Sequence, residues 1–262
     1  MKVVSWNVNS VRARFDHLLA FLDAEKPDVV GLQEIKCEVG DFPTMELLAA
    51  GYHTIALGQK SYNGVALLSR EAPQQVRDGL DGDPGSSPQA RAISARFGGV
   101  NVLNIYVPNG NEVGSDKFDY KLRWLQALRD TVDGRYYDDE PLIILGDFNI
   151  APRDIDVHDT RMWNGSVLCD DRVRGHLSKL LEWGLSDAIP ENDPPYSWWD
   201  YRGGGFERDL GLRIDLALHT SRIQVKSCRV AREWRGLERA SDHAPLVVEI
   251  AALKAEELDT AG

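Results

Sequence analysis

The chain has 262 residues, enough to bury a large core in one big α/β domain or two small ones. Its composition, 43% hydrophobic and 27% charged, is that of an ordinary globular protein, and no apolar run approaches the length of a membrane span. The formal net charge of −11 argues mildly against nucleic acid as a partner, because nucleic-acid binders are usually basic. A local basic face, or carboxylates gathered around a cation, is compatible with the same charge.

The N-terminus and the cysteines give an expectation about the compartment. The stretch MKVVSWNVN enters a strand without the charged-then-apolar leader of a secretory signal. Cys37, Cys169 and Cys228 are odd in number and widely spaced, so they predict neither a disulfide framework nor a zinc site. We therefore expect reduced thiols and a cytoplasmic protein.

Short apolar, β-branched runs predict strands, and several runs are continuous, as in strands covered on both faces. In chain order these strands are Val3–Ser5, Val29–Leu32, Val65–Leu68, Ala92–Phe97, Val102–Val107, Leu142–Leu145, Leu216–Leu218, Ile223–Val230 and Ala244–Ile250. Amphipathic helical patterns lie over Phe15–Glu25, Lys117–Val132 and Gly175–Trp183. Gly79–Gln89 and Pro190–Gly211 are predicted loops, and the aromatic content of the second favours a lid or a loop that contacts substrate.

Many strands with fewer helices indicate packed sheets with helices outside, an α/β sandwich, rather than tight βαβ alternation. No repeat and no domain boundary is visible in the sequence. Residues 1–252 are therefore predicted to form a single domain, and residues 253–262 a polar, frayed tail.

Polar side chains recur where the predicted strands begin or end. The stretch LIILGDFNIAP ends a core strand with Asp147 and Asn149, and period-two alternation predicts that both point to one face while Phe148 points to the other. A single polar residue at a strand end usually caps a turn or faces water. Asp215 is different, because a carboxylate within an apolar strand is costly if it is buried unpaired.

Together these polar residues form a plausible converging site, although their spacing permits convergence without proving it. The set comprises Asn7, Glu34, Tyr106, Asp147, Asn149, Asp215, Asp242 and His243. Oxygen ligands dominate, so Mg²⁺ or Mn²⁺ suits the set better than zinc. Magnesium completes its shell with waters and substrate phosphate oxygens, which implies phosphoryl chemistry.

Several segments resemble the exonuclease III family of abasic-site (AP) endonucleases, within the DNase I-like endonuclease/exonuclease/phosphatase superfamily. GDFN and SDH alone indicate only the superfamily, whereas WNVNSVRAR, YSWWDYR and GLRID are more specific to its DNA-repair branch. LQEIK, YNGVALLSR and NIYVPNG also match, in the family's order, and the likeness covers nearly the whole chain. The resemblance implies a four-layer α/β sandwich, two packed mixed β-sheets flanked by helices.

The resemblance also implies roles for the polar set. Glu34 would be the principal metal ligand, and the implied metal set is Asn7, Glu34, Asp147, Asn149, Asp242 and His243. Asp147 would activate water or protonate the leaving oxygen, and Asn149 would hold Asp147 and contact the phosphate. The implied catalytic set is Tyr106, Asp147, Asn149, Asp215 and His243, with His243 polarised by Asp242 and Asp215 orienting its neighbours.

The DNA contacts follow from the same resemblance. Trp198, Leu212 and Ile214 would form an apolar pocket that admits a base-free sugar but not a nucleoside. Arg91, Asn109 and Arg202 complete the implied DNA-binding set. A local basic face could further include Arg12, Arg14, Arg70, Lys117, Lys121, Arg213 and Arg235, each of which is as well explained by a solvated side chain. Trp199 is interpreted as packing, and His158 as a surface residue.

The predicted function is that of a Mg²⁺- or Mn²⁺-dependent DNA-repair phosphodiesterase, acting as a monomer. Its substrate would be duplex DNA with abasic sites or blocked 3′ ends, through AP endonuclease, 3′–5′ exonuclease and 3′-phosphatase activities. The alternatives are a superfamily phosphatase acting on a small phosphate ester and an inactive DNA-binding protein of the same fold. The sequence leaves open the balance of activities, the number of metals and whether Asp147 acts as base or acid.

Overall fold

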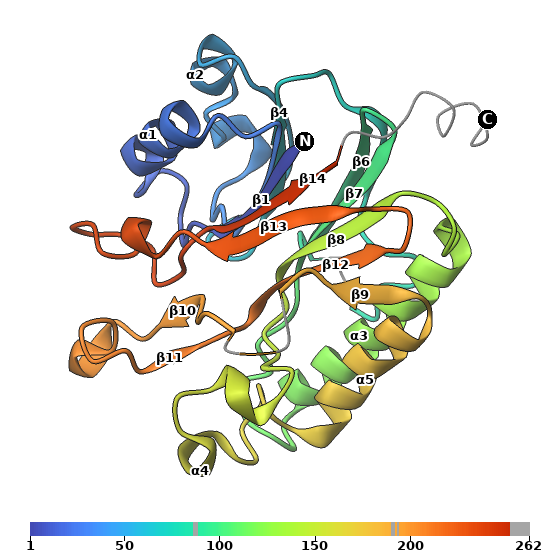
Figure 1. Cartoon of the computed structure of the whole chain (residues 1–262), viewed down its shortest axis with the longest axis vertical. Helices are drawn as coiled ribbons and strands as arrows, with labels where there is room; N and C mark the ends of the chain where they lie inside the picture. Colours follow the sequence, from blue (N-terminus) through green and yellow to red (C-terminus); the bar gives the residue numbers. More distant parts are fainter. Residues whose placement is uncertain (86–88, 190–191, 193, 252–262) are drawn as a thin grey trace.

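The computed structural model of the chain describes residues 1–85, 89–189, 192 and 194–251. Two six-stranded sheets are stacked face to face (Figure 1). The first contains, in spatial order, β13 (Val225–Val230), β14 (Leu246–Ile250), β1 (Lys2–Asn7), β2 (Val29–Gln33), β4 (Val65–Ser69) and β3 (His53–Leu57). The second contains β5 (Gln74–Asp78), β6 (Ala92–Phe97), β7 (Val100–Tyr106), β8 (Leu142–Asp147), β12 (Asp215–Thr220) and β9 (Leu185–Asp187). Each sheet is mixed, because β1 pairs in parallel with β2 and β7 with β8.

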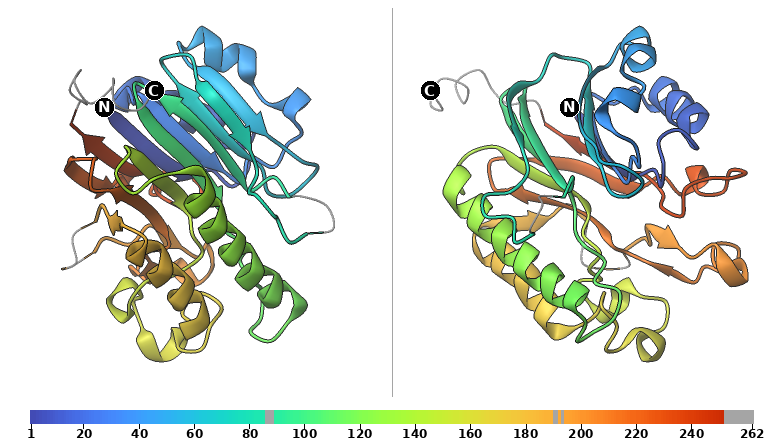
Figure 2. Two further views of the ribbon diagram at one scale, coloured as in Figure 1. Left: turned by 90° about the vertical axis from the view of Figure 1, so that its right-hand side faces the viewer. Right: turned by 180° about the vertical axis from the view of Figure 1, so that it is seen from behind.

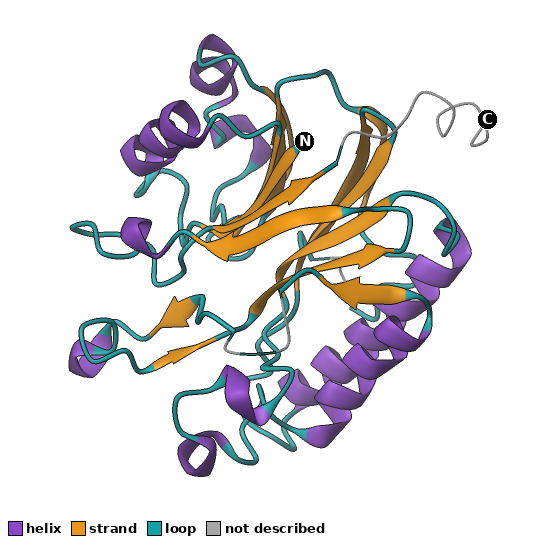
Figure 3. Cartoon of the chain, in the orientation of Figure 1, coloured by secondary structure: helices purple, strands orange, loops and turns teal. Residues whose placement is uncertain are grey.

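Helices cover the outer face of each sheet (Figures 2 and 3). α1 (Phe15–Glu25) and α2 (Thr44–Ala49) lie outside the first sheet, and α3 (Asp116–Arg135) and α5 (Asp171–Glu182) outside the second. The short helix α4 (Thr160–Trp163) and the small ribbon β10 (Trp198–Trp199) with β11 (Gly211–Leu212) lie beyond the sandwich. This arrangement confirms the predicted four-layer α/β sandwich.

Three buried clusters hold the layers together, and strand alternation decides which cluster receives each side chain. Val3 and Ile143 point between the two sheets, whereas their neighbours Val4 and Ile144 point toward the helices. Strands that contribute to two clusters read as continuous apolar runs in the sequence. No helix in the part of the chain that the structure describes is long and apolar enough to cross a membrane.

The predicted elements match the structure where a buried face marks them. α1 has the predicted bounds, whereas α3 extends beyond its predicted range at both ends. Ser115 caps the N-terminus of α3 by accepting a hydrogen bond from the Phe118 N–H. β5 was not predicted, because every residue of this edge strand is exposed and its sequence therefore carries no apolar pattern. β10 lies within the stretch predicted as a loop, and β11 begins at the last residue of that stretch. The predicted tail at 253–262 lies outside the described residues.

The topology brings the polar strand ends to one edge of the sandwich. β1 and β2 are parallel, so Asn7 lies beside Gln33 and one residue from Glu34. β7 and β8 are parallel as well, so Tyr106 lies beside Asp147. The loop before β14 completes the edge, because the Ser241 hydroxyl donates to the Asn7 carbonyl at 2.6 Å.

Candidate active site

Two of the predicted site residues follow their strands on a left-handed backbone. Glu34 directly after β2 has φ 49°, and Asn149 shortly after β8 has φ 48°. Non-glycine residues adopt this region at a cost, and such residues gather at functional sites. The prediction that strand alternation places Asp147 and Asn149 on one face is therefore wrong, although the two residues do lie together. β8 ends at Asp147, and a turn in which the Asn149 N–H donates to Asp147 Oδ1 at 2.9 Å brings the two together while Phe148 is buried in the core.

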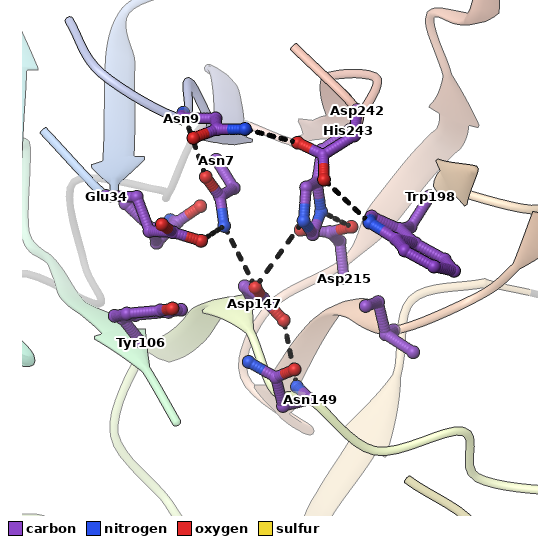
Figure 4. A network of polar contacts seen from close by, with 12 residues as sticks. Asn7, Asn9, Glu34, Tyr106, Asp147, Asn149, Trp198, Asp215, Asp242 and His243 are labelled. Atoms are coloured by element: carbon purple, nitrogen blue, oxygen red, sulfur yellow. Dashed lines mark hydrogen bonds and ion pairs between the residues drawn. The ribbon is translucent and has the colours of Figure 1, made fainter. Parts of the chain in front are cut away.

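Asp147 lies at the centre of the cluster (Figure 4). Its Oδ2 accepts from Asn7 Nδ2 at 3.0 Å and lies 3.7 Å from His243 Nε2. Burial raises the pKa of Asp147, and the carboxylates of Asp215 and Glu34 raise it further against the lowering effect of His243. A carboxyl group with a raised pKa is suited to moving a proton near neutral pH.

His243 is held by Asp215, which corrects the predicted partner Asp242. His243 Nδ1 lies 2.8 Å from Asp215 Oδ2, and both side chains are buried. Asp215 stands directly opposite Asp147 in the β8–β12 pair, so its carboxylate reaches the far side of the imidazole. Burial lowers the pKa of His243, but Asp215 and Asp147 outweigh this and raise it well above its ordinary value. The imidazolium therefore points Nε2 toward the open site.

Asp242 instead connects two neighbouring side chains. Its Oδ2 accepts from the Trp198 indole N–H at 3.0 Å, and its Oδ1 accepts from Asn9 Nδ2 at 3.0 Å. Burial raises the pKa of Asp242, but His243 and these two hydrogen bonds lower it overall. The residue directly before His243 thus ties the Trp198 side chain to the first sheet.

The other predicted ligands gather around Glu34. Asn7 Nδ2 donates to Glu34 Oε1 at 2.9 Å, and Lys36 Nζ lies 2.8 Å from Glu34 Oε2. Burial and the carboxylates of Glu34 and Asp147 raise the pKa of Tyr106 well above its ordinary value, so its phenol stays a hydrogen-bond donor. Figure 4 shows Glu34, Asn7, Tyr106 and Asp147 facing one another.

The donor set fits a hard cation bound through few protein ligands. Among the described residues, no three His, Cys, Asp or Glu side chains are grouped as a self-sufficient metal cage. Magnesium does not require one, because it is commonly held by one or two carboxylates and keeps several waters. Buried Asp215 Oδ1 has no hydrogen-bond partner, so one carboxylate oxygen of the cluster keeps a free acceptor site although Asp215 is paired with His243.

A hollow of about 820 Å³ opens over this cluster. Of the predicted DNA-binding residues, Asn109, Trp198, Arg202 and Ile214 line it. Leu212 does not, because it is fully buried behind Trp198, with which it pairs across β10 and β11.

The remaining tryptophan and arginine predictions have different outcomes. Trp199 is fully buried against Phe206, which confirms its interpretation as packing. Arg91 lies over the Tyr106 ring at 4.7 Å and lines an adjoining hollow with Tyr106 and Asn109.

Three of the candidate DNA-contacting cations are structural. Arg213 is buried between Asp156 and Asp187, and Arg235 is buried and donates to the Trp199 carbonyl. Lys121 is fully buried and donates to three carbonyl oxygens. Burial lowers the pKa of Lys121 to about 7, against the smaller raising effects of Asp147, Cys169 and Asp170.

One wall of the hollow was missed in the sequence. Trp163 lies edge-on to Trp198, with ring centroids 6.2 Å apart, and Val167 and Leu168 line the same wall. His158 backs the wall through an edge contact with Trp163, so it is half-buried rather than a free surface residue. Trp163 ends the short helix α4, and the other residues belong to the irregular segments on either side of it. The aromatic and apolar residues of this stretch were the available signal in the sequence.

Fold and site together define a phosphate-ester hydrolase of the DNase I-like class. The chain belongs to the endonuclease/exonuclease/phosphatase family, which matches residues 4–243. Exodeoxyribonuclease III of Haemophilus influenzae is 34% identical, over 95% of this chain and 99% of the relative. A Neisseria 3′ phosphatase solved with a product DNA hairpin is 41% identical over 96% of this chain and 99% of its own, with a TM-score of 0.92. An AP endonuclease of Archaeoglobus fulgidus is 36% identical over 95% and 99%, also with a TM-score of 0.92. The comparisons confirm the resemblance found in the sequence.

Proposed function

We propose that this protein is a metal-dependent DNA-repair phosphodiesterase that cuts the backbone of duplex DNA at abasic sites and removes 3′ blocking groups or 3′ nucleotides. The observation that carries the proposal is the meeting of Asp147, His243 and Glu34 under one hollow. The activities that the relatives' names print, exodeoxyribonuclease, AP endonuclease and 3′ phosphatase, all hydrolyse phosphate esters of DNA.

The reaction needs an oriented water, positive charge on the phosphate and a proton for the leaving oxygen. Asp147 is the group that moves a proton, since it is central, buried and of raised pKa. His243 donates from Nε2 to a non-bridging phosphate oxygen, and Asp215 keeps the imidazole charged and oriented. Tyr106 donates its phenol hydrogen to the same phosphate.

The metal in this proposal is Mg²⁺ or Mn²⁺, held chiefly by Glu34 with Asn7. When bound, it supplies positive charge to the phosphate and polarises water. Asp147, Asn149, Asp242 and His243 complete the surroundings of the ion. Asn149 acts through its backbone N–H on Asp147, while its side-chain Oδ1 accepts from Asn109 Nδ2 at 2.9 Å.

The hollow favours a base-free sugar next to the scissile phosphate. Trp163, Trp198, Leu168 and Ile214 give it an apolar wall, and Arg202, exposed over 91% of its side chain, lies on its rim. Apolar walls gain from excluding water, and a lesion costs less to unstack than an intact base pair. We propose that the protein acts there as a monomer in the cytoplasm, within a single domain over residues 1–252.

The proposal is tested with three substrates at equal concentration and a titration of Mg²⁺ and Mn²⁺. They are a duplex with one tetrahydrofuran abasic analogue, a duplex with a 3′-phosphate and the small ester p-nitrophenyl phosphate. We expect metal-dependent incision and 3′-phosphate release, with the small ester hydrolysed at least ~10²-fold more slowly in kcat/KM, because DNA contacts contribute binding energy that the ester lacks. Hydrolysis of the ester without action on either duplex would identify a small-ester phosphatase instead.

A further inference from the structure

Lys121 is a buried cation whose position ties together three segments of the site. Its Nζ donates to the carbonyl oxygens of Asn149 at 2.7 Å, Val167 at 2.7 Å and Asn109 at 3.1 Å. The side chain starts from α3 and has no solvent exposure. The three acceptors are far apart in sequence, and all three residues line the hollow over Asp147.

The partners of Lys121 are unusual for a buried lysine. Burying a cation is costly unless its hydrogens are all satisfied, and a carboxylate is the usual partner. Here the described hydrogen-bond partners of Nζ are carbonyls alone, one for each of the three hydrogens of an ammonium group. A neutral amine has only two hydrogens and would turn its lone pair toward the third carbonyl. The three carbonyl oxygens around Nζ therefore favour the protonated ammonium form of Lys121, which has three hydrogens to donate.

The stem of Lys121 also sets the path of one of these segments. Gly110 has φ 94°, and a Cβ built on it would lie 3.1 Å from Lys121 Cδ and 3.2 Å from the Phe118 ring. The Asn109 loop is thus pressed against α3 at the point where Nζ binds its carbonyl. The Lys121 side chain therefore fixes this loop both by packing against Gly110 and by its hydrogen bond to the Asn109 carbonyl.

We propose that Lys121 is a positioning residue for phosphodiester hydrolysis, acting through the backbone of the three segments that surround the reacting phosphate. Its most direct route is Asn149, because the Asn149 N–H holds Asp147 Oδ1 and the Asn149 carbonyl is held by Lys121. A second route is Asn109, which bonds the Asn149 side chain. The inference rests on the proposed function, since it names how the same site keeps its geometry.

The first test is Lys121→Met, which keeps the stem and removes the ammonium. We expect kcat on the abasic duplex to fall ~10–100-fold with a smaller change in KM, as is usual when a group that orients reacting residues is lost. The matched control is Lys179→Met, an exposed lysine on α5 away from the hollow, which should keep wild-type kcat. A Lys121→Met enzyme with wild-type kcat would overturn the proposal.

Two further readouts separate positioning from mere stability. Propylammonium, which supplies the missing stem and charge, should restore activity to Lys121→Ala, whereas propanol should not. Amide hydrogen exchange should accelerate in the segments around Asn109, Asn149 and Val167 of Lys121→Met, but not in β1. Hydrogen exchange needs no substrate, so it tests whether Lys121 holds the three segments even if the wild-type protein leaves DNA intact. Equal rescue by propanol, or unchanged exchange in the three segments, contradicts the proposal.

Discussion

At the scale of single residues, the position of His243 between Asp147 and Asp215 explains how a site rich in carboxylates offers a positive charge to a phosphate. His243 lies between two carboxylates, at 2.8 Å from Asp215 and 3.7 Å from Asp147. Their combined effect raises the pKa of His243 although burial lowers it. The imidazole is therefore a fixed cation rather than a switch near neutral pH.

Replacing Asp215 by Asn tests this interpretation through the pH profile. Asn keeps the shape but removes the charge that raises the pKa of His243. Activity that needs the imidazolium is present below that pKa and is lost as pH rises through it. The alkaline limb of kcat against pH should therefore move to lower pH in Asp215→Asn, with kcat ~10²-fold lower at its maximum. An alkaline limb at the wild-type position would show that Asp215 does not set the charge of His243.

At the scale of elements, a buried triad of charged side chains links a loop beyond the sandwich to the second sheet. Arg213, next to β12, donates to Asp156 at 2.7 Å and to Asp187 at 2.6 Å. Asp156 belongs to the loop that continues into the Trp163 wall, and it also accepts from the Arg153 N–H at 2.9 Å. The wall is therefore anchored to the second sheet by charge as well as by packing.

Removing the buried Asp156 charge from this triad should destabilise the protein strongly. Asp156→Asn leaves Arg213 buried with incomplete compensation, so we expect the free energy of unfolding in urea to fall by about 3 kcal/mol or more. The contrasting pair is Arg12 with Asp41, whose side chains are 61% and 54% exposed. Asp41→Asn should change the unfolding free energy by less than about 1 kcal/mol. Equal losses in the two variants would contradict the anchoring role.

The role of the Trp163 wall in substrate selection is tested by measuring the preference for abasic over undamaged DNA. Trp163→Ala removes the ring that stands edge-on to Trp198 and widens the hollow. The ratio of kcat/KM for the abasic duplex to kcat/KM for a matched undamaged duplex should fall ~10-fold, within the range that apolar pockets discriminate. Trp183→Ala, at a half-buried tryptophan away from the hollow that donates to Asp133 of α3, is the control and should keep the ratio. An unchanged ratio in Trp163→Ala would show that this wall does not contribute to substrate selection.

At the scale of the whole molecule, the site exists only when the two sheets pack. Asn7 and Glu34 come from the first sheet, Asp147 and Asp215 from the second, and His243 from the loop before β14. Parallel pairing within each sheet aligns two strand ends, and stacking of the sheets brings the aligned ends together. A net charge of −11 is compatible with this design, since part of the acidity is concentrated where a cation fits.

The sequence predicted the sandwich and the convergence of polar strand ends because both depend on buried strands with clear apolar patterns. It did not predict the partner of His243, since the pairing of β8 with β12 that places Asp215 there joins distant segments. Lys121 looked like a surface cation, because nothing local reveals that three distant carbonyls meet its ammonium group. Trp163 was missed because it lies in the short helix α4, which has no amphipathic pattern and whose position depends on tertiary contacts.

The central claim is that the cluster around Asp147 hydrolyses the DNA backbone. The most direct measurement is the single-turnover rate of incision of a duplex with one tetrahydrofuran analogue, at saturating Mg²⁺, for wild type, Asp147→Asn and the exposed control Asp139→Asn. The account predicts a rate ~10²–10³-fold lower or worse for Asp147→Asn and a wild-type rate for Asp139→Asn. Incision by Asp147→Asn at the wild-type rate would contradict it.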